Sequence, residues 1–198
     1  MRRGFKTWAE RKSIDLRRLL GLQPLSPLPA LRLAAHLSVI VIPPSAIPGI
    51  PADVLKTLLA EGQGNWSAVT IIVDDQSVII YNTSHADTRR ESDLMHEIAH
   101  LICKHKPTRI DPPGVFPWAL RTFDAQQEQE AEWLGGCLQV PRDAVLQLVR
   151  RGYGNEAIAA HFGSSEDMVR FRRNMTGIDK QVARAANFVS GRITRTIV

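Results

Sequence analysis

The feature that most constrains this chain is the five-residue segment H-E-I-A-H at residues 96–100. It lies within residues 88–104, where apolar positions recur at helical spacing. On a helix, residues four apart share one face and lie one turn apart. The imidazoles of His96 and His100 are therefore predicted to point the same way and to reach one zinc ion at about 2.0–2.1 Å.

Glu97 is rotated by about 100° from His96 on the same helix, so it flanks such an ion rather than pointing at it. Zinc lowers the pKa of a bound water to about 7. A carboxylate beside that water can take its proton and pass it to a leaving amine. The motif thus predicts hydrolysis with Glu97 as the general base, and the competing interpretation is a chance match on a polar helix face.

A catalytic zinc site also needs a third protein ligand and an open position. A second helix is predicted over residues 124–138, and it carries Glu128, Glu130 and Glu132. Glu128 and Glu132 lie on one edge of this helix and Glu130 on the other, so periodicity alone does not choose between the edges. A solvated acidic face is the alternative interpretation of such a cluster.

Further elements are predicted around these two helices. The β-rich runs at residues 68–73 and 78–81 predict a hairpin. Residues 38–42 are a strand candidate that stops at two prolines. Helices are also expected over residues 5–20, 30–37, 52–60 and 141–150, and a proline-rich loop over residues 107–118.

Two longer segments extend the motif: L-M-H-E-I-A-H-L at residues 94–101 and E-Q-E-A-E-W-L-G-G-C-L-Q-V-P at residues 128–141. Together they resemble the ImmA/IrrE metallopeptidases, whose pattern is H-E-[IL]-[AGS]-H and then E-x-E-A-N-x-F-A-x-x-L-L-M-P. The spacing from the first Glu to the Pro agrees without gaps. Residues 79–82 are similar to the family's strand ahead of the active helix, and Arg89 falls where the family usually has an Arg.

The resemblance implies that His96, His100 and Glu128 are the zinc ligands and that Glu97 is the general base. The expected fold class is α+β. A small antiparallel sheet would pack against the H-E-x-x-H helix as a minimal gluzincin-like core, with further helices at the C-terminal end. Four more residues are candidates for supporting a ligand or contacting substrate: Tyr81, Asn82, Arg89 and Glu132.

The chain departs from the family pattern in several places. Glu132 stands where the family usually has Asn, Asp93 where it often has Thr, and L-Q-V-P at residues 138–141 replaces L-L-M-P. Glu132 either supports a ligand histidine or competes with Glu128 for the metal. His105 lies off the face of His100 and is predicted to be a surface residue near the helix end.

Two short helices are expected around residues 156–162 and 165–174, and residues 156–170 resemble a helix-turn-helix, with Gly163 in the turn and Ser164 at a capping position. Arg170, Arg172 and Arg173 would line the second helix and meet phosphates. The alternative is a helical hairpin packed on the core without DNA contact. DNA binding is the less favoured of the two interpretations.

Two hypotheses of function follow. The first is a regulatory zinc endopeptidase; the resemblance implies a protein substrate, typically a helix-turn-helix repressor, and a repressor encoded nearby would be the prime candidate. The strand ending at Tyr81 and Asn82 would pair with an extended segment of it. The second is a non-enzymatic regulator, stapled by zinc, that binds DNA or a repressor through its C-terminal helices. Glu97 argues against the second, because a structural site closes its fourth position with a protein ligand.

The net charge of +5 permits an acidic partner without requiring one. The two cysteines fit a reducing cytosol. The polar N-terminus and the lack of any run of about 20 apolar residues predict a cytoplasmic protein without a membrane partner. Four segments are expected: a basic helix and linker (residues 1–29), the zinc peptidase core (30–151), the helix-turn-helix-like pair (152–178) and a basic tail (179–198).

Overall fold

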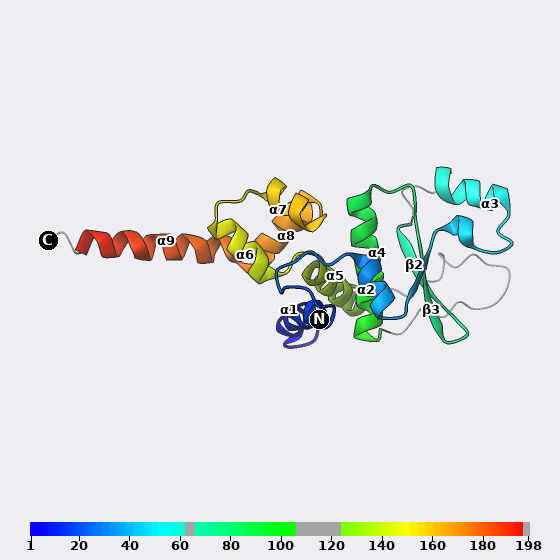
Figure 1. Cartoon of the computed structure of the whole chain (residues 1–198), viewed down its shortest axis with the longest axis horizontal. Coiled ribbons are helices and arrows are strands. Elements are labelled where there is room, and N and C mark those ends of the chain that lie inside the picture. The colour runs from blue at the N-terminus through cyan, green and yellow to red at the C-terminus, as the bar shows by residue number, and fades with distance from the viewer. Residues whose placement is uncertain (62–65, 106–123, 196–198) are drawn as a thin grey trace.

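The computed structural model of the chain describes residues 1–61, 66–105 and 124–195. The predicted loop over residues 107–118 lies outside these ranges. Figure 1 shows an elongated arrangement with the sheet at one end and a long C-terminal helix at the other. The elements are α1 (Phe5–Leu19), α2 (Ala30–His36), β1 (Ile40–Ile42), η1 (Pro44–Ala46), α3 (Ala52–Lys56), η2 (Thr57–Glu61), β2 (Ala68–Val73), β3 (Gln76–Tyr81), α4 (Asp87–Cys103), α5 (Ala125–Gln139), α6 (Arg142–Arg150), α7 (Asn155–Phe162), α8 (Glu166–Thr176) and α9 (Ile178–Arg195).

The three strands form one sheet in the order β1-β3-β2. The predicted hairpin is present: β2 and β3 are antiparallel and are joined at Asp74 and Asp75, which have φ values of 48° and 62°, as a tight two-residue hairpin turn requires. The expected α+β class is confirmed. The sheet itself is mixed, however, because β1 pairs with β3 in parallel. The long connection between them lets the chain cross over and return in the same direction.

β3 is the central strand, with β2 paired along its whole length on one side and β1 paired with Val78, Ile79 and Ile80 on the other. The main-chain groups of these three residues are therefore used on both sides. Pairing of the strand end at Tyr81 and Asn82 with a substrate stays a prediction. In the part of the chain that the structure describes, the outer side of β2 has no pairing strand.

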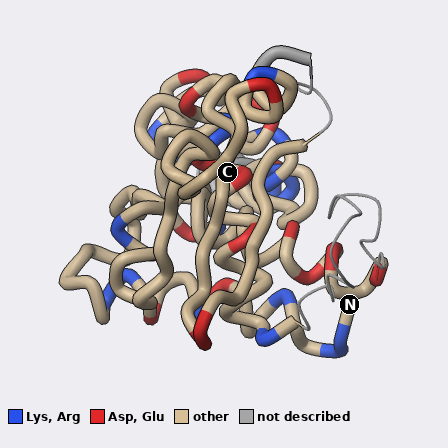
Figure 2. Tube along the Cα trace, turned by 90° about the vertical axis from the view of Figure 1, so that its right-hand side faces the viewer, with Lys and Arg blue, Asp and Glu red and all other residues tan. Residues whose placement is uncertain are grey.

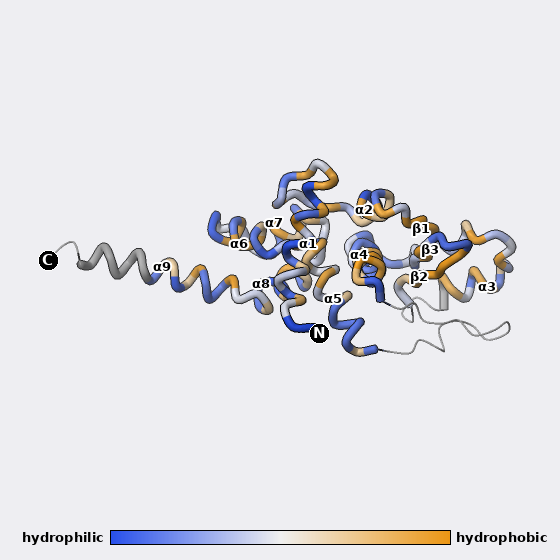
Figure 3. Tube along the Cα trace, turned by 90° about the horizontal axis from the view of Figure 1, so that it is seen from below, coloured by the Kyte–Doolittle hydropathy of each residue, from blue (hydrophilic) through white to orange (hydrophobic). Residues whose placement is uncertain are grey.

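Helix α4 lies between the sheet and α5 and contacts both. Met95, Ile98 and Leu134 are fully buried at this junction, as is Ile79 of β3. In Figure 3 the strands are largely hydrophobic, and polar segments alternate with apolar ones along the outer helices. The H-E-x-x-H helix is thus fixed on two sides by apolar packing, which holds its side chains in one orientation.

Helix α1 packs on α5 and contributes Phe5, Ala9 and Leu16 to the same hydrophobic core. Ser13 donates a hydrogen bond from Oγ to the Cys137 carbonyl at 2.6 Å. The N-terminal helix, which the sequence placed in a segment separate from the core, therefore shares that core.

A second hydrophobic cluster joins α6, α7, α8 and α9. Its fully buried members include Val145, Ile158, Val169 and Ile178. The expected α7–α8 pair is present, but Ser165 rather than Ser164 caps α8, by accepting a hydrogen bond from the Met168 N–H. Helix α9 covers most of the tail that was expected over residues 179–198, and it extends away from the other helices in Figure 1.

No helix in the described ranges combines the length and the apolar character needed to cross a membrane.

The packing of α1 predicts a clear contrast between two of its leucines. Leu16 is 2% exposed and Leu19 is 68% exposed. Leu16→Ala should lower the free energy of unfolding by about 2–5 kcal/mol, because it leaves a cavity in the core. Leu19→Ala should change it by less than about 0.5 kcal/mol. Urea unfolding of the two variants measures this, and equal stabilities would show that α1 is not part of the core.

Candidate metal centre

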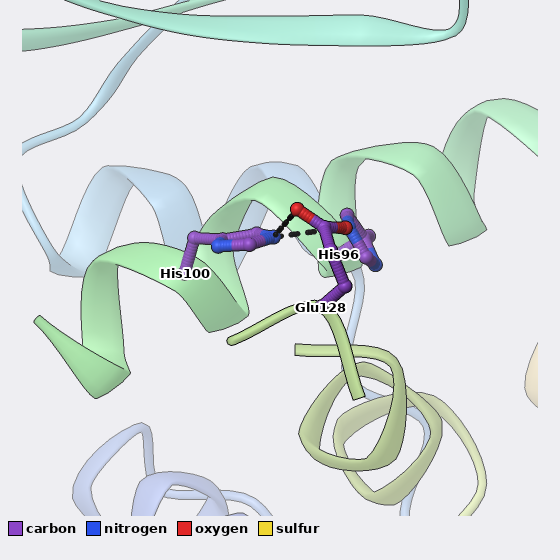
Figure 4. Close-up of side chains that lie close together, drawn as sticks. All are labelled: His96, His100 and Glu128. Atoms are coloured by element: carbon purple, nitrogen blue, oxygen red, sulfur yellow. Dashed lines mark hydrogen bonds and ion pairs between the residues drawn. The ribbon is translucent and has the colours of Figure 1, made fainter. Parts of the chain in front are cut away.

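His96 and His100 of α4 and Glu128 of α5 point toward one another across the junction of the two helices (Figure 4). The His96 Nε2 atom lies 3.0 Å from His100 Nε2 and 3.2 Å from Glu128 Oε2. His100 Nε2 lies 3.6 Å from Glu128 Oε1. Ligands about 2.0–2.1 Å from a tetrahedral zinc ion are about 3.3 Å apart, so these spacings fit one shared ion.

The backbone of both helices explains why these groups meet. Asp124 caps the start of α5 by accepting hydrogen bonds from the N–H groups of Gln126 and Gln127, which places Glu128 in the first turn. A Cβ added at Gly135 would lie 3.5 Å from the His96 Cα atom. This is an ordinary van der Waals distance, so α5 packs on the α4 backbone with room for little more than a Cβ, and this packing brings Glu128 within reach of both histidines.

The three side chains are partly exposed, at 31% for His96, 16% for His100 and 28% for Glu128. Burial, and then the neighbouring His96, lower the pKa of His100 to about 4. His100 is therefore neutral at pH 7 and its ring nitrogen is free to bind a cation. Two imidazoles and one carboxylate on a partly exposed face match the donor set that catalytic zinc sites use.

Glu97 is 4% exposed and sits one position after His96. Thr70 of β2 donates a hydrogen bond from its Oγ1 to Glu97 Oε2 at 2.6 Å. This bond orients the carboxylate, and it joins the sheet to the site. Thr70 could not be recognised from the sequence, since an isolated threonine in a strand carries no signal of its own.

The other candidate residues lie in different surroundings. Glu132 is exposed, and the group of described residues able to hold a metal consists of His96, His100 and Glu128. Asn82 is 1% exposed; it donates to the Trp66 carbonyl at 3.1 Å and accepts hydrogen bonds from the N–H and hydroxyl of Ser84. Asn82 thereby fixes the chain as it leaves β3.

The remaining two candidates are Tyr81, at the end of β3, and Arg89, in the first turn of α4. Tyr81 ends β3 and packs against the core. Arg89 is half-exposed, with its Nε atom 4.0 Å from Asp93 Oδ2. Asp93 in turn contacts the buried His85 at 2.8 Å. Arg89 and Asp93 therefore belong to a polar cluster at the start of α4.

His105, expected at the surface, is instead buried, with 6% of its side chain exposed. Lys104 ends α4 in the left-handed conformation, and the next residue turns back so that its N–H donates to the His100 carbonyl. His105 Nδ1 then lies 3.0 Å from His100 Nδ1. A left-handed cap at a lysine rather than a glycine gives no sequence signal.

The arginines of α8 do not form the phosphate-facing row that the sequence suggested. Arg172 is fully buried. Arg173 is held by Asp179, and Arg170 pairs with Asp167 at 2.7 Å. In Figure 2, basic and acidic positions are interspersed along the trace. The prediction that Arg172 meets phosphates is thus wrong, because its side chain is buried and donates to the Val140 carbonyl.

The family model for the IrrE N-terminal-like domain, Peptidase M78, matches residues 59–174. The chain belongs to this family. The match spans α4 and α5, and so all three residues of the candidate metal centre. This confirms the resemblance to the ImmA/IrrE metallopeptidases, and it places the chain among peptidases that use a metal. No curated protein and no solved structure matched the chain.

The geometry predicts different effects for two glutamates on α5. Glu128→Gln should weaken zinc binding by more than about 100-fold, because it removes a charged ligand and not merely a group that supports one. Glu132→Gln should leave zinc binding unchanged, because Glu132 is exposed. Competition with a chromophoric chelator measures both affinities. Loss of affinity in the Glu132 variant alone would assign the third ligand to Glu132 instead.

Proposed function

We propose that this protein is a zinc-dependent endopeptidase that cleaves a regulatory protein in the cytoplasm. The observation that carries the proposal is the buried Glu97 carboxylate next to the His96–His100–Glu128 donor set. A metal site that only stabilises a fold has no use for such a base. The free thiols of Cys103 and Cys137 are in keeping with a reducing compartment.

A zinc ion held by His96, His100 and Glu128 would supply a Lewis acid for water and for the substrate carbonyl. Glu97 would accept a proton from the attacking water, whose oxygen bonds to the carbonyl carbon, while Thr70 holds the Oε2 atom. The protonated Glu97 would then donate this proton to the amine that leaves as the C–N bond breaks. Glu97 thus acts first as base and then as acid.

The outer edge of β2 is the proposed docking strand for the substrate. Thr70 lies on this strand and contacts Glu97, so a segment paired with β2 runs past the catalytic carboxylate. Ile72 and Val73 are about half-exposed on β2, at 47% and 48%. Strand pairing uses main-chain hydrogen bonds, which accept many sequences, and these side chains add apolar contacts.

The proposed substrate is a helix-turn-helix repressor encoded near this gene, as the family resemblance implies. Cleavage of a repressor would release its target genes. The alternative of a non-enzymatic DNA-binding regulator is weakened by the arginines of α8. With Arg172 buried and Arg173 paired with Asp179, few cations are left on α8 to meet phosphates.

Substitution of the general base tests the proposed activity. Glu97→Gln keeps the shape of the side chain but removes its basicity, so cleavage of the neighbouring repressor should slow by about 10²–10⁴-fold. Zinc content should stay at one ion per chain. Mass spectrometry of the fragments over time measures the rate, with Glu132→Gln as the control. Cleavage by the Glu97 variant at the wild-type rate would contradict the proposal.

A further inference from the structure

A chain of buried polar contacts runs from His100 away from the candidate metal centre. His100 Nδ1 faces His105 Nδ1 at 3.0 Å, and His105 Nε2 faces Glu130 Oε2 at 3.4 Å. The side chains of His105 and Glu130 are 6% and 2% exposed. The sequence offered Glu130 only as one of three candidates for the third ligand, and it gave His105 no role at the metal centre.

The far end of this chain is closed by Arg2. Its backbone N–H and its Nε donate to Glu130 Oε1 at 2.8 Å and 3.0 Å, and its Nη2 lies 2.7 Å from Oε2. Both carboxylate oxygens of Glu130 therefore face the Arg2 guanidinium, and Oε2 also faces His105 Nε2.

The contacts allow one arrangement of protons when His100 binds a cation. Its Nε2 faces His96 and Glu128, so that atom carries the lone pair and Nδ1 carries the proton. That proton needs an acceptor, and His105 Nδ1 is the atom it meets. His105 then carries its own proton on Nε2, which points at the Glu130 carboxylate. Every donor in the chain has an acceptor in this arrangement alone.

His105 is badly placed to be a metal ligand itself. It contacts the Nδ1 edge of His100, whereas the donor atoms of the metal centre gather at the Nε2 edge. The two edges lie on opposite sides of the imidazole ring. In this orientation His105 can support the ligand His100 through its Nδ1 atom.

We propose that His105 and Glu130, with Glu130 held by Arg2, are positioning residues that fix the ring orientation and the tautomer of the ligand His100. The proposal rests on the metal centre of the proposed function. Partners of this kind raise the basicity of a ligand histidine and lower the entropy that it loses on binding the metal. The N-terminal segment would thereby contribute directly to metal affinity.

The test measures zinc affinity by chelator competition, together with the visible spectrum of the cobalt-loaded protein, in the full-length chain. His105→Phe keeps the ring shape but removes the acceptor, and it should lower zinc affinity by about 10–100-fold. His105→Asn places an amide oxygen near the position of Nδ1 and should recover most of the loss. The cobalt spectrum should change in His105→Phe, because the freed His100 ring alters the coordination geometry.

A matched pair on α5 tests the second residue. Glu130→Gln removes the charge that polarises His105 and should lower zinc affinity by about tenfold or more. Glu132→Gln, two positions along the same helix and exposed, should have no effect. Urea unfolding of each metal-free variant shows whether it is folded. If His105→Phe does not fold, the Glu130 and Glu132 variants decide the question.

A failure of the proposed metal centre can be told apart from a failure of the positioning role of His105 and Glu130. If the wild-type chain binds no zinc, the metal centre of the proposed function is wrong, and this appears before any variant is made. If wild type binds zinc while folded His105→Phe and Glu130→Gln keep its affinity and its cobalt spectrum, the positioning role is wrong and the metal centre stands.

Discussion

The close packing of α5 on α4 is the contact on which the rest of the site depends. At Gly135 the two backbones approach so closely that an added Cβ would touch the Met95 carbonyl oxygen at 3.4 Å. This approach sets the first turn of α5 opposite the histidine face of α4, so that one carboxylate meets two imidazoles. A side chain that extends beyond Cβ at Gly135 would press on the α4 backbone, and donor atoms must lie within a few tenths of an ångström of their positions to share an ion.

Helix α5 also organises what surrounds the site. Its C-terminal end receives two buried guanidinium groups: Arg17 donates to the Leu138 carbonyl at 2.7 Å and Arg172 to the Val140 carbonyl at 3.0 Å. Cations at this end complement the helix dipole and satisfy carbonyls that have no partner within the helix. Arg172 also pairs with Glu10 of α1. The end of α5 opposite the metal centre therefore fixes both the N-terminal helix and α8 to the core.

The features that could be predicted from the sequence depend on residues close together in the chain, such as helical spacing and β-rich runs. Spacing alone placed His96 and His100 on one helix face, and the hairpin followed from β-rich runs around Asp74 and Asp75. Periodicity left Glu128 and Glu130 unresolved, since both flank the same apolar stripe. In the structure Glu128 lies with the two histidines that could bind a metal, whereas the Glu130 carboxylate contacts His105 Nε2.

What the sequence did not reveal depends on contacts between distant residues. The parallel pairing of β1 with β3 depends on a crossover, and the burial of His105 depends on a left-handed Lys104. Arg172 looked like a phosphate ligand because its burial against Glu10 is set by residues far away in the chain. Such contacts have no period and no short motif, so a single sequence does not show them.

The proposed function requires one metal ion bound by His96, His100 and Glu128 with one position open. X-ray absorption at the zinc edge of the zinc-loaded protein measures this coordination. We expect a four-coordinate ion with nitrogen and oxygen neighbours at about 2.0–2.1 Å and scattering from two imidazole rings. A sulfur neighbour at about 2.3 Å, which would bring in Cys103 or Cys137, or a single imidazole would contradict it.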